Sequence, residues 1–131
     1  MAAEQRHPDA AWLEACCSRW PGVTRDIKWA TRRVYSVDRK MFAITAADRR
    51  ELVDLYVKVP DERFLELTDC PGIEPAPYLA RARWVAIVEP RRFATAELAA
   101  FVLESYVIVC AKLSKRRQAE LGHLPTLETP R

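Results

Sequence analysis

The stretch RRVYSVDRKMFAIT (residues 32–45) decides how this chain folds. Strand-forming residues fill both of its halves, and the polar pair Asp38-Arg39 separates them. Two such runs around a short polar segment are typical of a β-hairpin, so we expect two antiparallel strands joined by a tight turn at residues 37–40. The turn contains no glycine, which leaves its type open.

Segments on both sides of this hairpin supply the other elements. The alternation of apolar and polar residues in ELVDLYVKV (residues 51–59) predicts a third strand with one buried face, and RWVAIVE (residues 83–89) predicts a fourth. Apolar residues at helical spacing predict a helix over roughly residues 8–19, a short helix over residues 60–69 and a long helix over roughly residues 95–113.

The resulting element order, α-β-β-β-α-β-α, lacks a regular β-α-β alternation. It therefore predicts an α+β fold of two layers, in which an antiparallel sheet of about four to five strands carries the helices on one face. A length of 131 residues is enough for a single domain. We expect this domain to span residues 1–117, and residues 118–131, which are poor in apolar side chains, to form a flexible C-terminal tail.

Composition excludes several classes of function. A net charge of +3 is only mildly basic, and three glycines provide no glycine-rich phosphate loop. The chain has no Cys-x-x-Cys pair, and its two histidines lie near the ends, so we expect no metal site and no cofactor. The N-terminus does not resemble a signal peptide, and the long helix is too polar to span a membrane. We therefore expect a cytoplasmic protein, not associated with membranes, with four free cysteines: Cys16, Cys17, Cys70 and Cys110.

Five segments resemble those of the MmcQ/YjbR family in their order and spacing, and together they extend over residues 21–117. They are PGVTRDIKWA (21–30), RKMFAI (39–44), LYVKV (55–59), PAPYLARARWVAI (75–87) and SYVIVCAKLSKRR (105–117). Three positions depart from the family pattern. Ala30 and Arg39 stand where the family has glycine, and Ser114 stands where it has proline, so the final helix can run one turn further.

This resemblance implies a fold similar to those of CyaY and frataxin, with an antiparallel sheet and two main helices on one face. It also implies DNA binding, because the family is described as having a "double wing" of hairpins. Frataxins carry an acidic ridge on their first helix, whereas the corresponding helix here carries only Asp9 and Glu14. Hard cations need clustered oxygen ligands, so this departure argues against a role in iron binding.

Basic and aromatic residues in three regions are the candidates for contact with nucleic acid. Arginine and lysine neutralise phosphates, and an aromatic ring stacks on a base. The predicted set comprises Lys40 in the hairpin, Tyr78, Arg81 and Arg83 before the fourth strand, and Lys112, Lys115, Arg116 and Arg117 at the end of the long helix. We expect them to bind DNA largely through its phosphate backbone. Simple structural roles remain open: cations stabilise helix C-termini, and charges protect edge strands.

A second interpretation also stays open. The chain can instead be a protein-interaction module, or a module that binds a small anionic ligand in a cleft near Lys58, Tyr78 and Trp84. An enzyme is disfavoured and we predict no catalytic residue, because Ser105 lies on the buried face of its helix and is about 10 Å along the axis from Lys112. The sequence leaves the oligomeric state open and allows a monomer.

Overall fold

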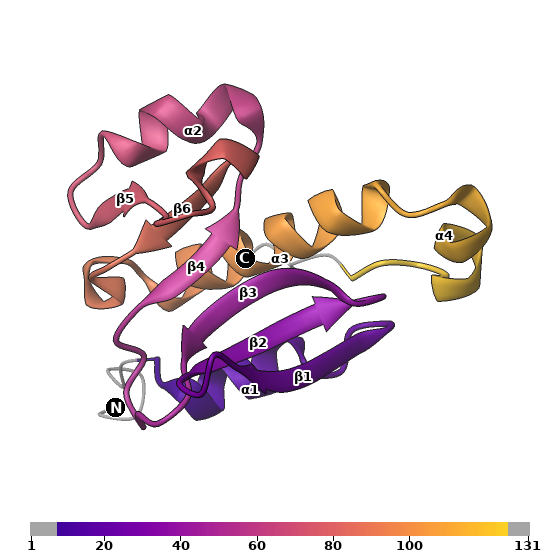
Figure 1. Ribbon diagram of the computed structural model, residues 1–131, viewed down its shortest axis with the longest axis horizontal. Coiled ribbons are helices and arrows are strands. Elements are labelled where there is room, and N and C mark those ends of the chain that lie inside the picture. The colour runs from indigo at the N-terminus through magenta and orange to yellow at the C-terminus, as the bar shows by residue number, and fades with distance from the viewer. Residues whose placement is uncertain (1–7, 126–131) are drawn as a thin grey trace, which may run out of the picture.

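The computed structural model describes residues 8–125 and has an α+β fold with a six-stranded antiparallel sheet in the order β1-β2-β3-β4-β6-β5 (Figure 1). The strands are β1 (Val23–Lys28), β2 (Arg32–Val37), β3 (Lys40–Ala46), β4 (Leu55–Lys58), β5 (Ile73–Pro75) and β6 (Trp84–Ile87). The helices are α1 (Ala10–Cys17), α2 (Asp61–Thr68), α3 (Thr95–Ala111) and α4 (Lys115–Leu121), with short 3-10 turns η2 (Ala80–Ala82) and η3 (Pro90–Arg92).

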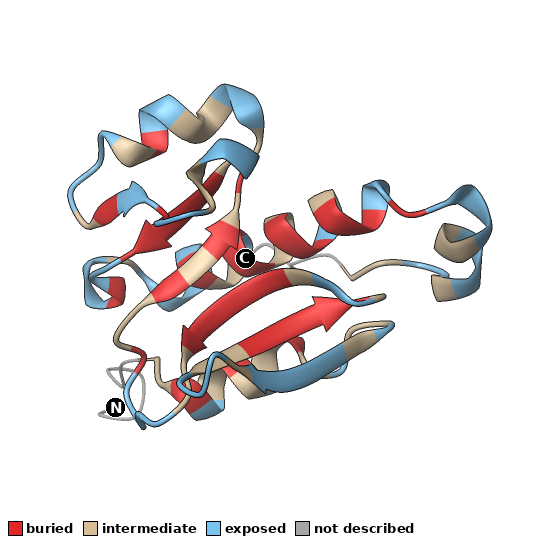
Figure 2. Cartoon of the chain, in the orientation of Figure 1, coloured by how far each residue is buried: buried red, intermediate tan, exposed pale blue. Residues whose placement is uncertain are grey.

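The helices lie on one face of the sheet, as the sequence predicts. The main core fills the space between them: Leu13 of α1 and Val102 of α3 are fully buried against Val57 and Val85 of the sheet. Leu67 brings α2 into the same core at the edge formed by β5 and β6. Figure 2 shows that the buried residues follow the central strands and the inner side of α3, whereas β1 is largely exposed. The predicted α+β fold class is thus confirmed.

The expected turn at residues 37–40 is present, and a three-residue connection with a similar left-handed backbone joins β1 to β2. Asp38 and Arg39 have φ values of 52° and 68°, and Trp29 and Ala30 have φ values of 52° and 66°. Two consecutive residues with positive φ define a type I′ turn, which matches the twist of a hairpin and usually contains glycine. Both turns therefore keep the left-handed backbone although neither contains glycine.

Two strands and one helix go beyond the sequence prediction, so the sheet has six strands instead of four to five. The strand β1 pairs with β2 along its whole length, and the short β5 pairs with the outer edge of β6. A separate helix, α4, begins after Ser114, whose Oγ accepts a hydrogen bond from the Arg117 N–H at 3.1 Å. The expected domain boundary at residue 117 falls inside α4, and residues 126–131 of the expected tail lie outside the described residues.

The sheet contains a seam between β3 and β4. These strands share only two paired positions, Ala43 with Val57 and Ile44 with Tyr56, before they diverge (Figure 1). Beyond that point the fully buried Ser105 of α3 links them, because its Oγ accepts from the Lys58 N–H at 2.9 Å and donates to the Phe42 carbonyl at 2.6 Å. A helix side chain thus replaces the missing ladder bonds.

Within residues 8–125, no α-helix lies on the other face of the sheet, and we call it the open face. Its centre is a small second cluster of buried residues: Val34, Ile44, Ala76, Trp84 and Ala86. The loop that connects β5 to β6 folds over part of this cluster, because the Ala76 N–H donates to the Trp84 carbonyl at 3.1 Å. The open face is therefore partly sealed on the β6 side, where Trp84 is only 5% exposed.

Candidate nucleic-acid interface and open-face pocket

Several of the predicted basic residues lie at one end of the sheet, where β3 and β4 have diverged. Lys40 begins β3, Lys58 ends β4 and Arg83 directly precedes β6, and antiparallel pairing puts these three positions at the same end. Lys112 follows α3 and lies close enough to Lys58 to repel its charge. We call Lys40, Lys58, Arg83 and Lys112 the basic end. Its members come from segments far apart in the sequence.

Lys58 is the most constrained cation of this group. It is half-buried on the open face of β4, and its Nζ donates a hydrogen bond to the Ala82 carbonyl of η2. Partial burial lowers the pKa of its ammonium group, and repulsion from Lys112 and Arg83 lowers it further, against the attraction of Asp61. The local charge balance thus favours an additional anion.

Arg83 and Arg81 differ in how strongly the fold engages them. Arg83 has a left-handed backbone (φ 65°), pairs with Asp61 at 3.5 Å and lies over the Phe64 ring at 5.3 Å from its centroid. Arg81, in η2, is exposed. The geometry therefore assigns Arg83 a part in holding α2 against β6, and presents Arg81 to solvent.

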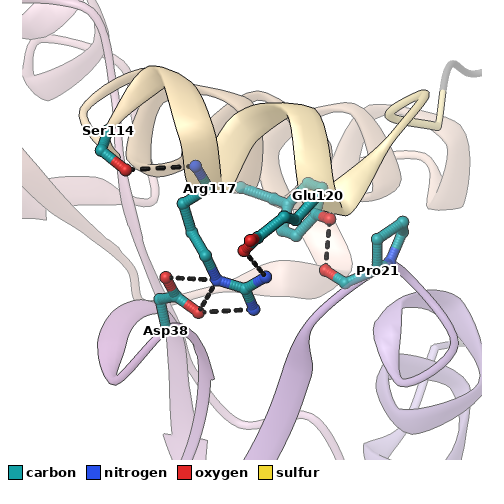
Figure 3. A network of polar contacts seen from close by, with 6 residues as sticks. Pro21, Asp38, Ser114, Arg117 and Glu120 are labelled. Atoms are coloured by element: carbon teal, nitrogen blue, oxygen red, sulfur yellow. Dashed lines mark hydrogen bonds and ion pairs between the residues drawn. The ribbon is translucent and has the colours of Figure 1, made fainter.

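The segment KLSKRR (residues 112–117) separates into residues that face solvent and one that holds the fold together. Arg117 Nε lies 2.8 Å from both carboxylate oxygens of Asp38, and its Nη1 lies 3.2 Å from Glu120 (Figure 3). These contacts hold α4 against the β2–β3 turn, and Arg117 holds the pKa of the Asp38 carboxyl below its usual range. Lys112, Lys115 and Arg116 are exposed, and Arg116 pairs with Glu120 at 3.5 Å. Arg117 thus acts in the first place as a structural residue.

Tyr78 and Trp84, which both belong to the expected cleft, have opposite environments. Tyr78 is fully exposed, and its backbone has a φ of 66°. Trp84 is buried in the open-face cluster, where it anchors β6. The prolines of PAPYL (residues 75–79) thus belong to a loop that covers Trp84 and turns Tyr78 outward.

A pocket of about 510 Å³ lies on the open face beside Tyr78. Its lining is mostly apolar and comprises Trp29, Arg32, Met41, Ile44, Tyr56, Pro77, Tyr78 and Leu79. Among the described residues that line it, neither Lys58 nor Trp84 occurs, so the cleft expected from the sequence is displaced toward the β1–β2 turn. Trp29, which is not among the predicted site residues, is 64% exposed at the rim. Its only sequence signal is an aromatic residue placed at a turn.

Arg32 supplies the positive charge of this pocket. Its Nη1 pairs with the Asp54 Oδ2 at 3.1 Å, and its guanidinium carbon lies 4.8 Å from the centroid of the Tyr56 ring. The ion pair and the cation–π contact hold the guanidinium in place, while its buried Nη2 has no hydrogen-bond partner among the described residues. The mostly apolar lining suits a planar, weakly polar group better than a free anion.

Residues 8–125 contain no group of three or more histidine, cysteine or acidic side chains that could hold a metal ion. In this described part, no helix is long and apolar enough to cross a membrane. Cys17 and Cys110 are buried, Cys16 is half-buried and Cys70 is exposed, and all four are free thiols.

Comparisons with known proteins agree with the fold. The model of the YjbR family matches residues 18–108, which is more than half of the chain, and the chain therefore belongs to the YjbR family. The crystal structure of the Deinococcus radiodurans protein DR2400, with a DUF419 domain, is similar at 26% identity and a TM-score of 0.77, over 88% of each chain. A protein from Pseudomonas syringae shares the fold at 17% identity and a TM-score of 0.56, over 73% of this chain and 92% of its own. No curated protein sequence matches the chain.

Proposed function

We propose that this YjbR-family protein binds nucleic acid without catalysing a reaction, and that the basic end contacts the phosphate backbone. The observation that carries the proposal is the proximity of Lys58, Arg83 and Lys112, which come from three separate segments; Lys40 lies at the same end of the sheet, on β3. Positive charges that the fold holds close together repel one another, and a bound phosphate reduces this repulsion. The exposed Arg81 and Lys115 lie next to this group in the sequence and extend it.

The contacts proposed here are electrostatic and read no base sequence in a duplex. The helices lie on the other face of the sheet, so the basic end presents strand ends and loops and not a recognition helix. We place this function in the cytoplasm, without a cofactor, and with DNA as the first nucleic acid to test.

The test is fluorescence anisotropy with a labelled random-sequence duplex at about 50 and 200 mM salt. Four phosphate contacts give a log–log salt slope of about −3.6, so affinity falls by about two decades between these concentrations. The double variant Lys40→Ala/Lys112→Ala is expected to bind more weakly and to lose about 1.8 units of slope.

A matched control removes two exposed charges elsewhere. Arg19→Ala/Arg91→Ala alters the net charge equally but lies outside the basic end, and is expected to keep nearly the whole slope. Arg117 is unsuitable as a probe, because its removal releases α4 from the turn. Absence of binding at the lower salt, or equal losses in the two double variants, contradicts the proposal.

The second candidate is a ligand-binding or protein-interaction module that uses the open-face pocket. The exposed rings of Tyr78 and Trp29 favour it, because exposed aromatic side chains are typical of binding surfaces. Arg32 is already paired with Asp54, which makes a small anion a poor occupant. If nucleic acid does not bind, this candidate becomes the leading hypothesis for the function.

A further inference from the structure

We infer that the open-face pocket receives an unpaired base, so that the protein prefers single-stranded nucleic acid to a duplex. This inference rests on the proposed function and adds the class of substrate. It is carried by three observations: the aromatic rim of the pocket, its apolar floor and its position beside the basic end.

The rim consists of two large aromatic side chains that the fold leaves in water. Trp29 is 64% exposed and Tyr78 is 103% exposed. Both residues also have a left-handed backbone, with φ values of 52° and 66°. Large side chains are rare in this conformation, and residues held in it cluster at binding sites. Two independent turns thus expose a flat ring beside the same pocket, and every base has a face that stacks on such a ring.

The floor between these rings is apolar and preformed. Met41, Ile44 and Tyr56 come from adjacent strands β3 and β4, and Ile44 and Tyr56 are directly paired across the seam. The volume of about 510 Å³ falls within the range of about 300–1,000 Å³ that is typical of ligand pockets. Arg32, fixed over the Tyr56 ring, adds a polar edge beside this floor.

The pocket adjoins the basic end along β4. Tyr56 and Lys58 alternate with buried residues along β4 and so share the open face. A strand whose phosphates meet the basic end therefore carries its bases over the pocket. In a duplex the same bases are stacked and paired, and their flat faces cannot reach the rings.

The test compares three oligonucleotides of equal length by anisotropy: a single strand, the duplex and an abasic strand with the same phosphates. The wild-type protein is expected to bind the single strand at least tenfold more tightly than the duplex or the abasic strand. Trp29→Asn and Tyr78→Asn remove the rings, and asparagine tolerates the left-handed backbone, so both variants are expected to fold. Each is expected to weaken single-strand binding by about tenfold, with duplex binding and salt slope unchanged.

Leu65→Gln is the matched control, because Leu65 is an apolar side chain, 80% exposed, on α2 and outside the pocket. Equal affinity for the single strand and the duplex, or no effect of the asparagine variants, overturns the inference and leaves the proposed function standing. Binding that does not depend on salt and that the asparagine variants abolish supports the second candidate. It overturns both the inference and the proposed function. Absence of binding to all three oligonucleotides also overturns both.

Discussion

Replacing Ser105 by alanine removes the link across the seam between β3 and β4. The change leaves two backbone groups without a partner, the Lys58 N–H and the Phe42 carbonyl, in a place where Ser105 itself is fully buried. An unsatisfied buried group costs about 1–3 kcal/mol, which gives about 2–6 kcal/mol for the pair. Because both groups bond to the same oxygen, a small closure of the seam recovers part of this loss. We expect the free energy of unfolding to fall by about 2–4 kcal/mol.

The assay is urea unfolding followed by tryptophan fluorescence and circular dichroism. The control is Ser36→Ala, since Ser36 is also a buried serine, 8% exposed, here on strand β2, and its hydroxyl makes no hydrogen bond among the described residues. The control is expected to change the free energy of unfolding by less than about 0.5 kcal/mol. If Ser105→Ala costs no more than Ser36→Ala, the seam does not depend on this hydroxyl and the reasoning fails.

Three further predictions concern the turns, the ion pair of α4 and the thiols. Ala30→Gly and Arg39→Gly relieve left-handed backbones and are each expected to raise the free energy of unfolding by up to about 1 kcal/mol in urea titrations, whereas a loss of stability would refute the turn assignment. Because Arg117 depresses the pKa of Asp38 in the folded state, the pair stabilises the fold above the ordinary aspartate pKa of about 4 and ceases to do so as pH falls through the folded pKa. Thermal unfolding should show this acid-dependent loss in the wild type and much less of it in Asp38→Asn. A thiol reagent should modify Cys70 rapidly in the native protein, and the buried Cys17 and Cys110 only on unfolding; rapid modification of the native Cys16→Ser/Cys70→Ser variant would contradict their burial.

Most of the fold could be predicted because its central elements carry clear patterns. The hairpin of β2 and β3 has two strand-forming runs around a polar turn, and α3 has a continuous apolar face. The strand β1 could not be predicted in this way, because four of its six residues are exposed and its sequence, VTRDIK, does not alternate. The strand β5 is only three residues long and ends in Pro75, so it resembles a loop. Edge strands take their form from the neighbour to which they pair, and a local pattern does not show that neighbour.

The candidate site was predictable only in its residue types. The sequence indicates which side chains are basic or aromatic, and Lys40, Tyr78 and Lys112 are indeed exposed. The sequence does not show that Arg117 forms an ion pair with Asp38, because the two residues lie 79 positions apart. It also gives no reason to link Trp29 with Tyr78, which line the same pocket because β3 and β4 bring the two halves of the sheet together. Long-range contacts of this kind follow from topology and not from composition.

The seam gives the molecule a mechanical property. One half of the sheet consists of β1, β2 and β3, the other of β4, β6 and β5, and their ladder has only two paired positions; the Ser105 hydroxyl and the contacts of Arg32 with Asp54 and Tyr56 are further links between them. A ladder this short is the natural place for the halves to rotate against each other, as a hinge. The pocket has walls on both sides of it, Trp29 on one and Tyr78 on the other. An occupant that touches both rings would therefore act as a clamp, slowing amide exchange at the joint and stiffening the whole sheet.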